Sequence, residues 1–192
     1  MKHLLQLTDE NLIKLYIVGD NNAFETIVNR HKDKIYTSIY LLIGDKYLAE
    51  DIFQDVFIRV IDNIKRGKYN ESGNFKNWVM TIAHNLSMDH HRNIKRKHSI
   101  ITSADKDIFE VLAFEEENIE ERIINEETHI KVRKLLDMLS QDQREVIVLR
   151  NYANLSFKEI AKLTDTCVNT SLGRMRYGLL NLRKLYYETP LA

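Results

Sequence analysis

Apolar residues recur at steps of three and four through most of the chain, and this spacing predicts α-helices rather than strands. The longest stripe stops before Gly44 and Asp45, which together break the pattern. Asp20 or Asn21 stands in front of it as an N-cap residue. The members of this stripe are Phe24, Ile27, Val28, His31, Ile35, Ile39 and Leu42.

The same spacing predicts helices on both sides of a long polar stretch. In the first half, helices are expected from Thr8 onward, over 46–66 and over 75–97. In the second half, four helices are expected near 128–139, 141–152, 156–163 and 167–187. We therefore predict an all-α protein of two small helical domains, residues 1–98 and 128–192, joined by a linker over 99–127.

Composition agrees with a helical, soluble chain. The 192 residues include one proline and six glycines, with 44% hydrophobic and 29% charged residues. No apolar run approaches the roughly 20 residues that a bilayer span needs, and the N-terminus lacks the pattern of a signal peptide. Cys167 is the single cysteine, which excludes an internal disulfide framework and fits a reducing compartment. We expect a cytoplasmic protein with no membrane insertion.

Charge is zero overall but is segregated along the chain. Residues 92–98 carry four Lys or Arg and no acid, and residues 144–184 carry eight against three acids. Between them, residues 105–127 carry ten acids against Lys106 and Arg122. This order suggests two parts that face a polyanion and an acidic connector between them. Each run is also compatible with an ordinary solvated surface.

Residues 156–184 have the spacing of a helix-turn-helix. A short helix begins at Ser156, a short turn follows at 164–166, and a second helix begins near Cys167. The second helix of such a motif can lie in the major groove of DNA. A plain surface hairpin of helices is the alternative.

The helix that begins near Cys167 has two contrasting faces. One is apolar and is predicted to be a core seam: Val168, Leu172, Met175, Leu179 and Leu182. The other carries short polar side chains and arginines, which can bond phosphates or base edges. Gly173 costs a helix about 1 kcal/mol relative to alanine, and it would let DNA approach the backbone closely. The predicted DNA contacts are Asn169, Thr170, Ser171, Gly173, Arg174, Arg176 and Tyr177.

The outer face of the helix over 49–66 has the features of a protein-binding surface. An exposed Ile58 is surrounded there by acids and a glutamine, which is typical of a protein-binding patch with an apolar centre and a charged rim. A solvated face with one stray isoleucine is the alternative. The predicted patch consists of Asp51, Gln54, Asp55, Ile58 and Asp62.

A metal-dependent enzyme is one rival interpretation. His84 and His91 share a face of the predicted fourth helix, while Asp89 and His90 point elsewhere. The sequence has no HExxH or CxxC pattern, no phosphate-binding glycine loop and no nucleophile elbow. Packing or phosphate-facing histidines are therefore favoured, and we predict no catalytic residue, no metal and no other cofactor.

The second domain resembles region 4 of bacterial sigma factors of the sigma-70 family, and the first resembles region 2. The region 2 likeness lies in residues 49–64, "AEDIFQDVFIRVIDNI", followed by 75–97. The region 4 likeness is carried by Leu139, Arg144, Leu149, Glu159, Ile160, Ala161, Val168, Thr170, Arg174 and Leu182. No region 3 block separates the two regions, and nothing is expected before region 2. This organisation resembles that of the extracytoplasmic-function (ECF) group.

Three departures from the usual pattern concern the recognition helix. Asp165 stands where the turn commonly has glycine, and Cys167 where a serine N-cap is common. "NTSLGRM" replaces a more typical "GTVKSRL". These changes leave the implied function intact. A promoter sequence copied from another member of the family, however, would not apply to this chain.

The resemblance implies a sigma factor that directs core RNA polymerase to promoters. The patch on the helix over 49–66 would dock on the β′ clamp helices, and region 4 would bind the −35 duplex beside the β flap. Region 2 would open the −10 duplex and hold one strand, for which aromatic residues beside a basic track are suited. The implied −10 contacts are Lys76, Asn77 and Asn85, with Arg92, Lys95, Arg96 and Lys97 on phosphates.

Two further implications concern partners. The acidic linker would thread the polymerase cleft, and an anti-sigma factor would be a partner. A stand-alone helix-turn-helix regulator is the second rival, but it would need neither the patch around Ile58 nor the aromatic and basic loop over 69–78.

Overall fold

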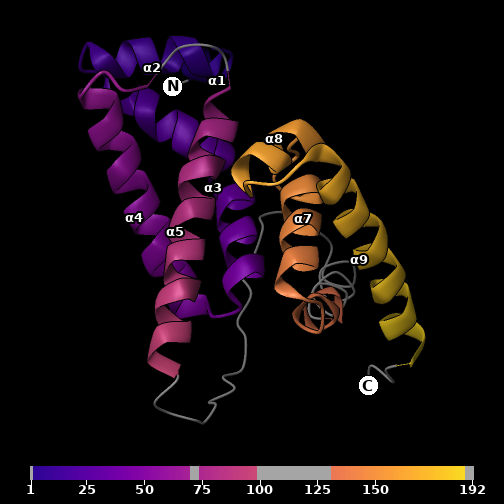
Figure 1. The fold of residues 1–192 in the computed structure, drawn as a ribbon. Helices are drawn as coiled ribbons and strands as arrows, with labels where there is room; N and C mark the ends of the chain where they lie inside the picture. Colours follow the sequence, from indigo (N-terminus) through magenta and orange to yellow (C-terminus); the bar gives the residue numbers. More distant parts are fainter. Residues whose placement is uncertain (1, 70–73, 99–130, 189–192) are drawn as a thin grey trace, which may run out of the picture.

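The computed structural model describes residues 2–69, 74–98 and 131–188, and every regular element in these ranges is an α-helix (Figure 1). The all-α prediction is therefore confirmed, whereas the predicted linker over 99–127 lies outside the described residues. Residues 131–137 form a helical segment ahead of α7. The other helices are α1 (Lys2–Leu5), α2 (Asp9–Ile17), α3 (Asn21–Ile43), α4 (Lys46–Lys65), α5 (Phe75–His98), α7 (Gln141–Asn151), α8 (Phe157–Leu163) and α9 (Val168–Glu188).

The helices begin and end where local chemistry satisfies their free backbone groups. The Thr8 hydroxyl accepts a hydrogen bond from the N–H of Asn11 at 3.3 Å, and the Asp20 carboxylate caps α3. Gly44 ends α3 with φ +82°, a left-handed conformation that suits glycine. Ser156 opens α8 within a capping box.

The first unit, residues 2–98, is a bundle built around α3, which packs against α2, α4 and α5 (Figure 1). Its core is the apolar stripe that the sequence predicted, with Ile27, Ile35 and Ile39 fully buried. Phe75 is also buried, and Trp78 packs against the same core.

The second unit, residues 131–188, packs α9 against α7 and α8, through a face that matches the predicted seam only in part. The predicted residues Met175 and Leu182 pack against the apolar core. The buried residues of α9 are Ser171 and Gly178. A Cβ at Gly178 would lie 2.8 Å from Cδ1 of Ile147 on α7, so the glycine lets the two helices approach. The predicted core seam is wrong at three positions, which are exposed: Val168, Leu172 and Leu179.

The two units pack against each other, with α7 lying along α3. Two apolar clusters found among the described residues each include residues from both units. One of them joins Leu41, Leu42 and Met88 of the first unit to Leu136 and Leu139 of the second. Burial of these side chains favours the packed arrangement by the hydrophobic effect.

Candidate nucleic-acid interface

The turn between α8 and α9 is held by backbone and hydroxyl hydrogen bonds. The N–H of Thr166 bonds the carbonyl of Ala161 at 2.9 Å, and the Thr166 hydroxyl lies 3.0 Å from that of Thr164. Asp165 has φ +51°, so it adopts the left-handed conformation that a glycine would take without strain. Aspartate tolerates this conformation better than most residues, which explains how the turn survives the departure seen in the sequence.

Cys167 caps the N-terminus of α9 in place of a serine. Its Sγ accepts a hydrogen bond from the N–H of Thr170 at 3.4 Å and lies 3.1 Å from the Thr170 hydroxyl. Thr170 lowers the pKa of the Cys167 thiol, first through its hydroxyl and then through its N–H, because both favour the thiolate. The thiol is exposed beside the polar face of the helix.

The predicted −35 contacts do not all share one surface. Four of them are exposed on α9: Asn169, Thr170, Arg176 and Tyr177. Gly173 has open space where a Cβ would lie, so its surroundings in the protein do not explain the glycine. Ser171 is fully buried, with its hydroxyl 3.2 Å from that of Thr166, and is not available to DNA in this arrangement.

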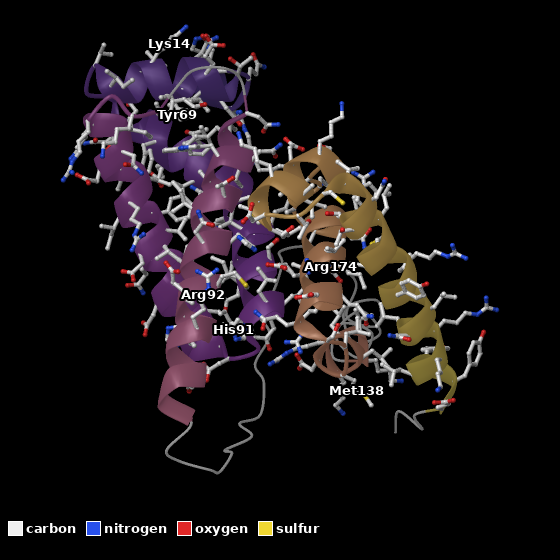
Figure 2. All side chains as sticks on the ribbon, in the orientation of Figure 1. Lys14, Tyr69, His91, Arg92, Met138 and Arg174 are labelled. Carbon is white, nitrogen blue, oxygen red and sulfur yellow. The ribbon has the colours of Figure 1, made fainter. Side chains whose placement is uncertain are left out.

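Arg174 points toward α7, as Figure 2 shows, and its guanidinium lies 2.6 Å from the Asp142 carboxylate. The arginine side chain is 24% exposed and the aspartate 59% exposed. This ion pair was not foreseen from the sequence, because Asp142 is 32 positions away and only the crossing of α7 and α9 brings it near.

At the start of α5, the predicted −10 contact Asn77 is engaged by the second unit. Its side-chain amide donates to Oε1 of Glu159 on α8 at 2.5 Å. Burial of Glu159 alone would raise its pKa, but hydrogen bonds from Ser156 and Asn77 and the charge of Lys76 lower it. Burial, helped by the charge of Lys34, lowers the pKa of Lys76.

Three aromatic side chains surround the start of α5. The ring of Tyr69 lies 4.7 Å from that of Trp78 and 6.0 Å from that of Phe75. Tyr69 and Phe75 also line a pocket of about 250 Å³ together with Thr8, Asp9 and Glu10 of the N-terminal segment. Phe75 is buried and two of the five lining residues are acids, so Tyr69 is the side chain of this pocket that can stack on a nucleotide base.

Asp9 ties this N-terminal segment to α3. Its carboxylate accepts a hydrogen bond from Arg30 at 2.5 Å and lies 2.7 Å from Nε2 of His31. Burial alone would raise the pKa of Asp9, but the hydrogen bonds and charges of His31 and Arg30 outweigh it and lower the pKa. The sequence placed His31 in an apolar stripe and did not pair it with Asp9.

The remaining −10 candidates lie along α5. Asn85 is exposed, and Arg92 is exposed with an ion pair to Asp89 at 3.4 Å. Figure 2 shows Arg92 and His91 on the lower half of α5. The side chains of the other three basic candidates, Lys95, Arg96 and Lys97, lie outside the described part.

On α4, the predicted protein-binding patch lies on the outer surface. Ile58 is 62% exposed, and Asp62 forms an ion pair with Arg66 at 2.9 Å. Asp51, Gln54 and Asp55 are exposed beside it. An exposed isoleucine with a charged rim is the arrangement that the sequence predicted.

The histidines of α5 take separate partners. Nε2 of His84 lies 2.5 Å from Oε1 of Glu145, and Nε2 of His91 lies 2.8 Å from the carbonyl oxygen of Leu42. Within residues 2–69, 74–98 and 131–188, no three His, Cys, Asp or Glu side chains come together to hold a metal ion. Among the same residues, no helix has the length and apolar character that crossing a bilayer requires.

The chain is similar to known proteins over most of its length. Residues 27–97 match the family model for sigma-70 region 2, and residues 129–172 match the model for sigma-70 region 4. The ECF RNA polymerase sigma factor SigW of Bacillus subtilis is 31% identical over 186 residues, covering 94% of this chain and 97% of that protein. The ECF RNA polymerase sigma-E factor of Escherichia coli K12 is 28% identical over 179 residues, covering 88% and 90%.

Two solved structures share the fold. CnrH, in complex with the cytosolic domain of CnrY, superposes with a TM-score of 0.66 at 20% identity, covering 94% of this chain and 99% of that one. The sigma factor RpoE of Bartonella quintana, in complex with the anti-sigma factor NepR, gives 0.68 at 19% identity, covering 86% and 97%.

The chain belongs to the sigma-70 family, in its ECF group. It is a sigma factor, and it directs RNA polymerase to promoters.

Proposed function

We propose that the two units divide promoter recognition between them, with residues 1–98 acting as region 2 and residues 128–192 as region 4. One observation carries the proposal for region 4. The second helix of the helix-turn-helix presents Asn169, Thr170 and Arg176 on its exposed N-terminal half, while its opposite side packs on α7 and α8. A helix presented in this way fits the major groove, which is about 12 Å wide.

In the −35 complex, short polar side chains and arginine take different tasks. Asn169 and Thr170 contact base edges or phosphates at the start of α9. Arg176 and Tyr177, one turn or more along, contact the flanking backbone. The absence of a side chain at Gly173 leaves room for DNA to approach.

The first unit handles the −10 element. Lys76, Asn77 and Asn85 on α5 contact the separated strand, and the pocket beside Tyr69 offers aromatic surface for a base. Arg92 and the basic residues after it, Lys95, Arg96 and Lys97, follow the phosphates. The pocket lies beside the start of α5 and the basic residues follow Arg92 near its end. The separated DNA strand can therefore follow this helix from the pocket to the basic residues.

The outer face of α4 binds core RNA polymerase. Ile58 supplies the apolar centre, and the acids and glutamine around it supply the charged rim. By the family's example the partner surface is the β′ clamp helices, and region 4 meets the β flap. The proposed patch is Asp51, Gln54, Asp55, Ile58 and Asp62.

No bond is made or broken by this chain, because RNA synthesis belongs to the polymerase. The protein acts where the polymerase acts, in the cytoplasm. Since CnrH and RpoE were solved with CnrY and the anti-sigma factor NepR, an anti-sigma factor is also proposed as a partner here.

Two single substitutions test this division. Promoters are first selected from random duplex DNA with reconstituted holoenzyme. Arg176→Ala should weaken binding of the selected −35 duplex by about 1 kcal/mol or more and leave core binding unchanged. Asp55→Ala should weaken core binding and leave the −35 affinity unchanged, with exposed Asn29→Ala on α3 as the control.

Run-off transcription decides between this proposal and a stand-alone regulator. The wild-type chain should restore promoter-specific transcription to core polymerase. Core polymerase that ignores the chain in a pull-down, while duplex binding persists, would favour the regulator. Equal loss of both activities in Arg176→Ala and Asp55→Ala would refute the division of labour.

A further inference from the structure

Leu172 lies on an exposed side of α9, although its apolar spacing predicted a core position. Its side chain is 44% exposed, and neither apolar cluster found among the described residues includes it. The preceding residue, Ser171, is fully buried, and successive residues of a helix are turned by about 100°. Leu172 therefore turns away from the packed side of α9 and faces solvent.

Leu172 shares this exposed side with residues that we propose to contact the −35 element. Residues three and four positions apart are neighbours on the surface of a helix. Leu172 lies three positions after Asn169 and four before Arg176, with Gly173 beside it. Asn169 and Arg176 are exposed, and Gly173 has open space where a Cβ would lie. An apolar side chain therefore stands within the polar group that faces DNA.

The next side chains along the helix are directed inward. Arg174 pairs with Asp142 of α7 at 2.6 Å, and Met175 packs against both apolar clusters. Because Gly173 has no side chain, the residue next to Leu172 leaves room for a base edge. A base pair that approaches the N-terminal half of α9 therefore meets Leu172.

Leucine gives this position a chemistry that differs from the typical family pattern. When "NTSLGRM" is set against "GTVKSRL", Leu172 stands in place of a lysine. A lysine ammonium group can bond a phosphate or an acceptor on guanine. Leucine has no hydrogen-bonding group, so its contribution to DNA binding has to come from contact with an apolar surface.

The major groove offers leucine one kind of apolar group, the C5-methyl group of thymine. Packing the leucine side chain on this methyl group removes both from water, which is favourable. At a G·C pair the same side chain would cover hydrogen-bonding groups that it cannot satisfy, and a polar group left without a partner costs free energy. The chemistry of Leu172 therefore favours a thymine at the base pair that it faces.

We propose that Leu172 is a specificity-determining residue of this sigma factor, which selects a thymine in the −35 element by packing on its C5-methyl group. The inference rests on the function proposed above, in which α9 lies in the major groove. It extends the surface formed by Asn169, Gly173 and Arg176 with an apolar base contact, which hydrogen-bonding residues do not supply. Base recognition by this helix then combines polar contacts with an apolar one.

Replacing thymine by deoxyuridine tests the contact, because uracil differs from thymine only by lacking the methyl group. The −35 duplex selected with reconstituted holoenzyme is synthesised as a series in which each thymine of either strand is replaced in turn. Competition for the wild-type holoenzyme should reveal one position at which loss of the methyl group weakens binding roughly fourfold, the factor expected for one buried methyl group. The other positions should show little change.

Variants of the protein assign the effect to Leu172. Leu172→Ala should bind the thymine and uracil duplexes equally, because the contact with the methyl group is gone. Leu172→Lys should also lose the distinction but keep or gain affinity, because its ammonium group attracts phosphates. Leu179→Ala is the matched control. Leu179 is 47% exposed on the same helix but lies about 10 Å farther along its axis, so this variant should retain the wild-type preference.

The outcomes separate this inference from the proposed function. If the holoenzyme binds the selected −35 duplex but no single uracil weakens binding, or the selected element contains no thymine, the role of Leu172 is refuted and the sigma factor function stands. If Leu172→Ala keeps the preference for thymine, another residue reads the methyl group and the role is again refuted. Loss of the preference in Leu172→Ala, with its retention in Leu179→Ala, supports the inference. A holoenzyme that selects no −35 sequence would refute both the −35 role of α9 and this inference.

Discussion

Arg174 of α9 and Asp142 of α7 form an ion pair at 2.6 Å that joins the recognition helix to the helix behind it. The arginine belongs to the face that we expect to meet the −35 element, yet in the free protein it points back to its own unit. When DNA binds, Arg174 therefore either leaves Asp142 and contacts the DNA, or stays paired with Asp142 and holds α9 in place.

We expect the first of these, and matched substitutions can show it. Arg174→Ala should weaken −35 binding by about 1–3 kcal/mol. Asp142→Ala should change it by less than about 1 kcal/mol, because a partly exposed pair contributes little by itself and its loss frees the arginine. Fluorescence anisotropy with the selected duplex measures both. Equal weakening by the two substitutions would instead make Arg174 a positioning residue.

Two glycines of α9 should respond to alanine in opposite ways. Gly178→Ala should destabilise the protein by about 1–3 kcal/mol, because the new methyl group would meet Ile147 at 2.8 Å in a packed crossing. Gly173→Ala has open space and should stabilise the helix by up to about 1 kcal/mol. Urea unfolding followed by circular dichroism gives both values.

The same pair separates stability from function. Gly173→Ala should weaken −35 binding despite the gain in stability, because the methyl group would stand between helix and DNA. Unchanged or tighter binding by Gly173→Ala would show that the glycine is not needed for close approach.

Acid should remove the contribution of Asp9 to stability. Its pKa is lower in the folded protein than in the unfolded chain, so its contribution is fully present above the unfolded value of about 3.9 and is lost as pH falls through the folded value. Asp9→Asn should therefore destabilise the protein by about 1–2 kcal/mol at pH 7 and progressively less below about pH 4.

Glu10→Gln is the matched control for Asp9→Asn. Glu10 pairs with exposed Lys14 at 2.6 Å within the same helix, so its loss should cost less than about 0.5 kcal/mol. Denaturant midpoints measured from pH 3 to 7 test both variants. A constant difference between Asp9→Asn and wild type over that range would contradict the assignment.

The Cys167 thiol should be more reactive than an ordinary exposed cysteine. Thr170→Val removes the hydroxyl that lowers the pKa of the thiol, and alkylation by iodoacetamide at pH 7 should then become roughly two- to fivefold slower. Thr170→Ser keeps a hydroxyl and should keep the wild-type rate. Identical pH–rate profiles for the valine variant and wild type would show that the hydroxyl has no effect on the thiol.

Much of the fold could be predicted because its signals are local. Thr8, Asp20 and Ser156 cap helices through groups two or three residues away, and the stripe containing Ile27 and Ile35 follows the helical period. The exposed position of Ile58 on α4 followed from the same period. These features depend on neighbours along the chain, which the sequence contains directly.

The face of α9 could not be chosen in this way. Its apolar period suggested burial of Leu172 and Leu179, but a helix crossing is set by which residues let two backbones approach. Gly178 does so against α7, while Ser171 is buried beside Thr166 of the turn. These two small residues, seven positions apart, were the signal that hydrophobicity alone overlooked.

By itself, the sequence determined the helices, their caps, the division into two units and the resemblance that identified the family, because each depends on residues that are close along the chain or on a motif. Only the tertiary structure decided which side of α9 is buried, that Asp142 holds Arg174, and that Glu145 and Glu159 reach α5. Those contacts join residues far apart in the chain, and they depend on how close the packed helices lie and at what angle they cross.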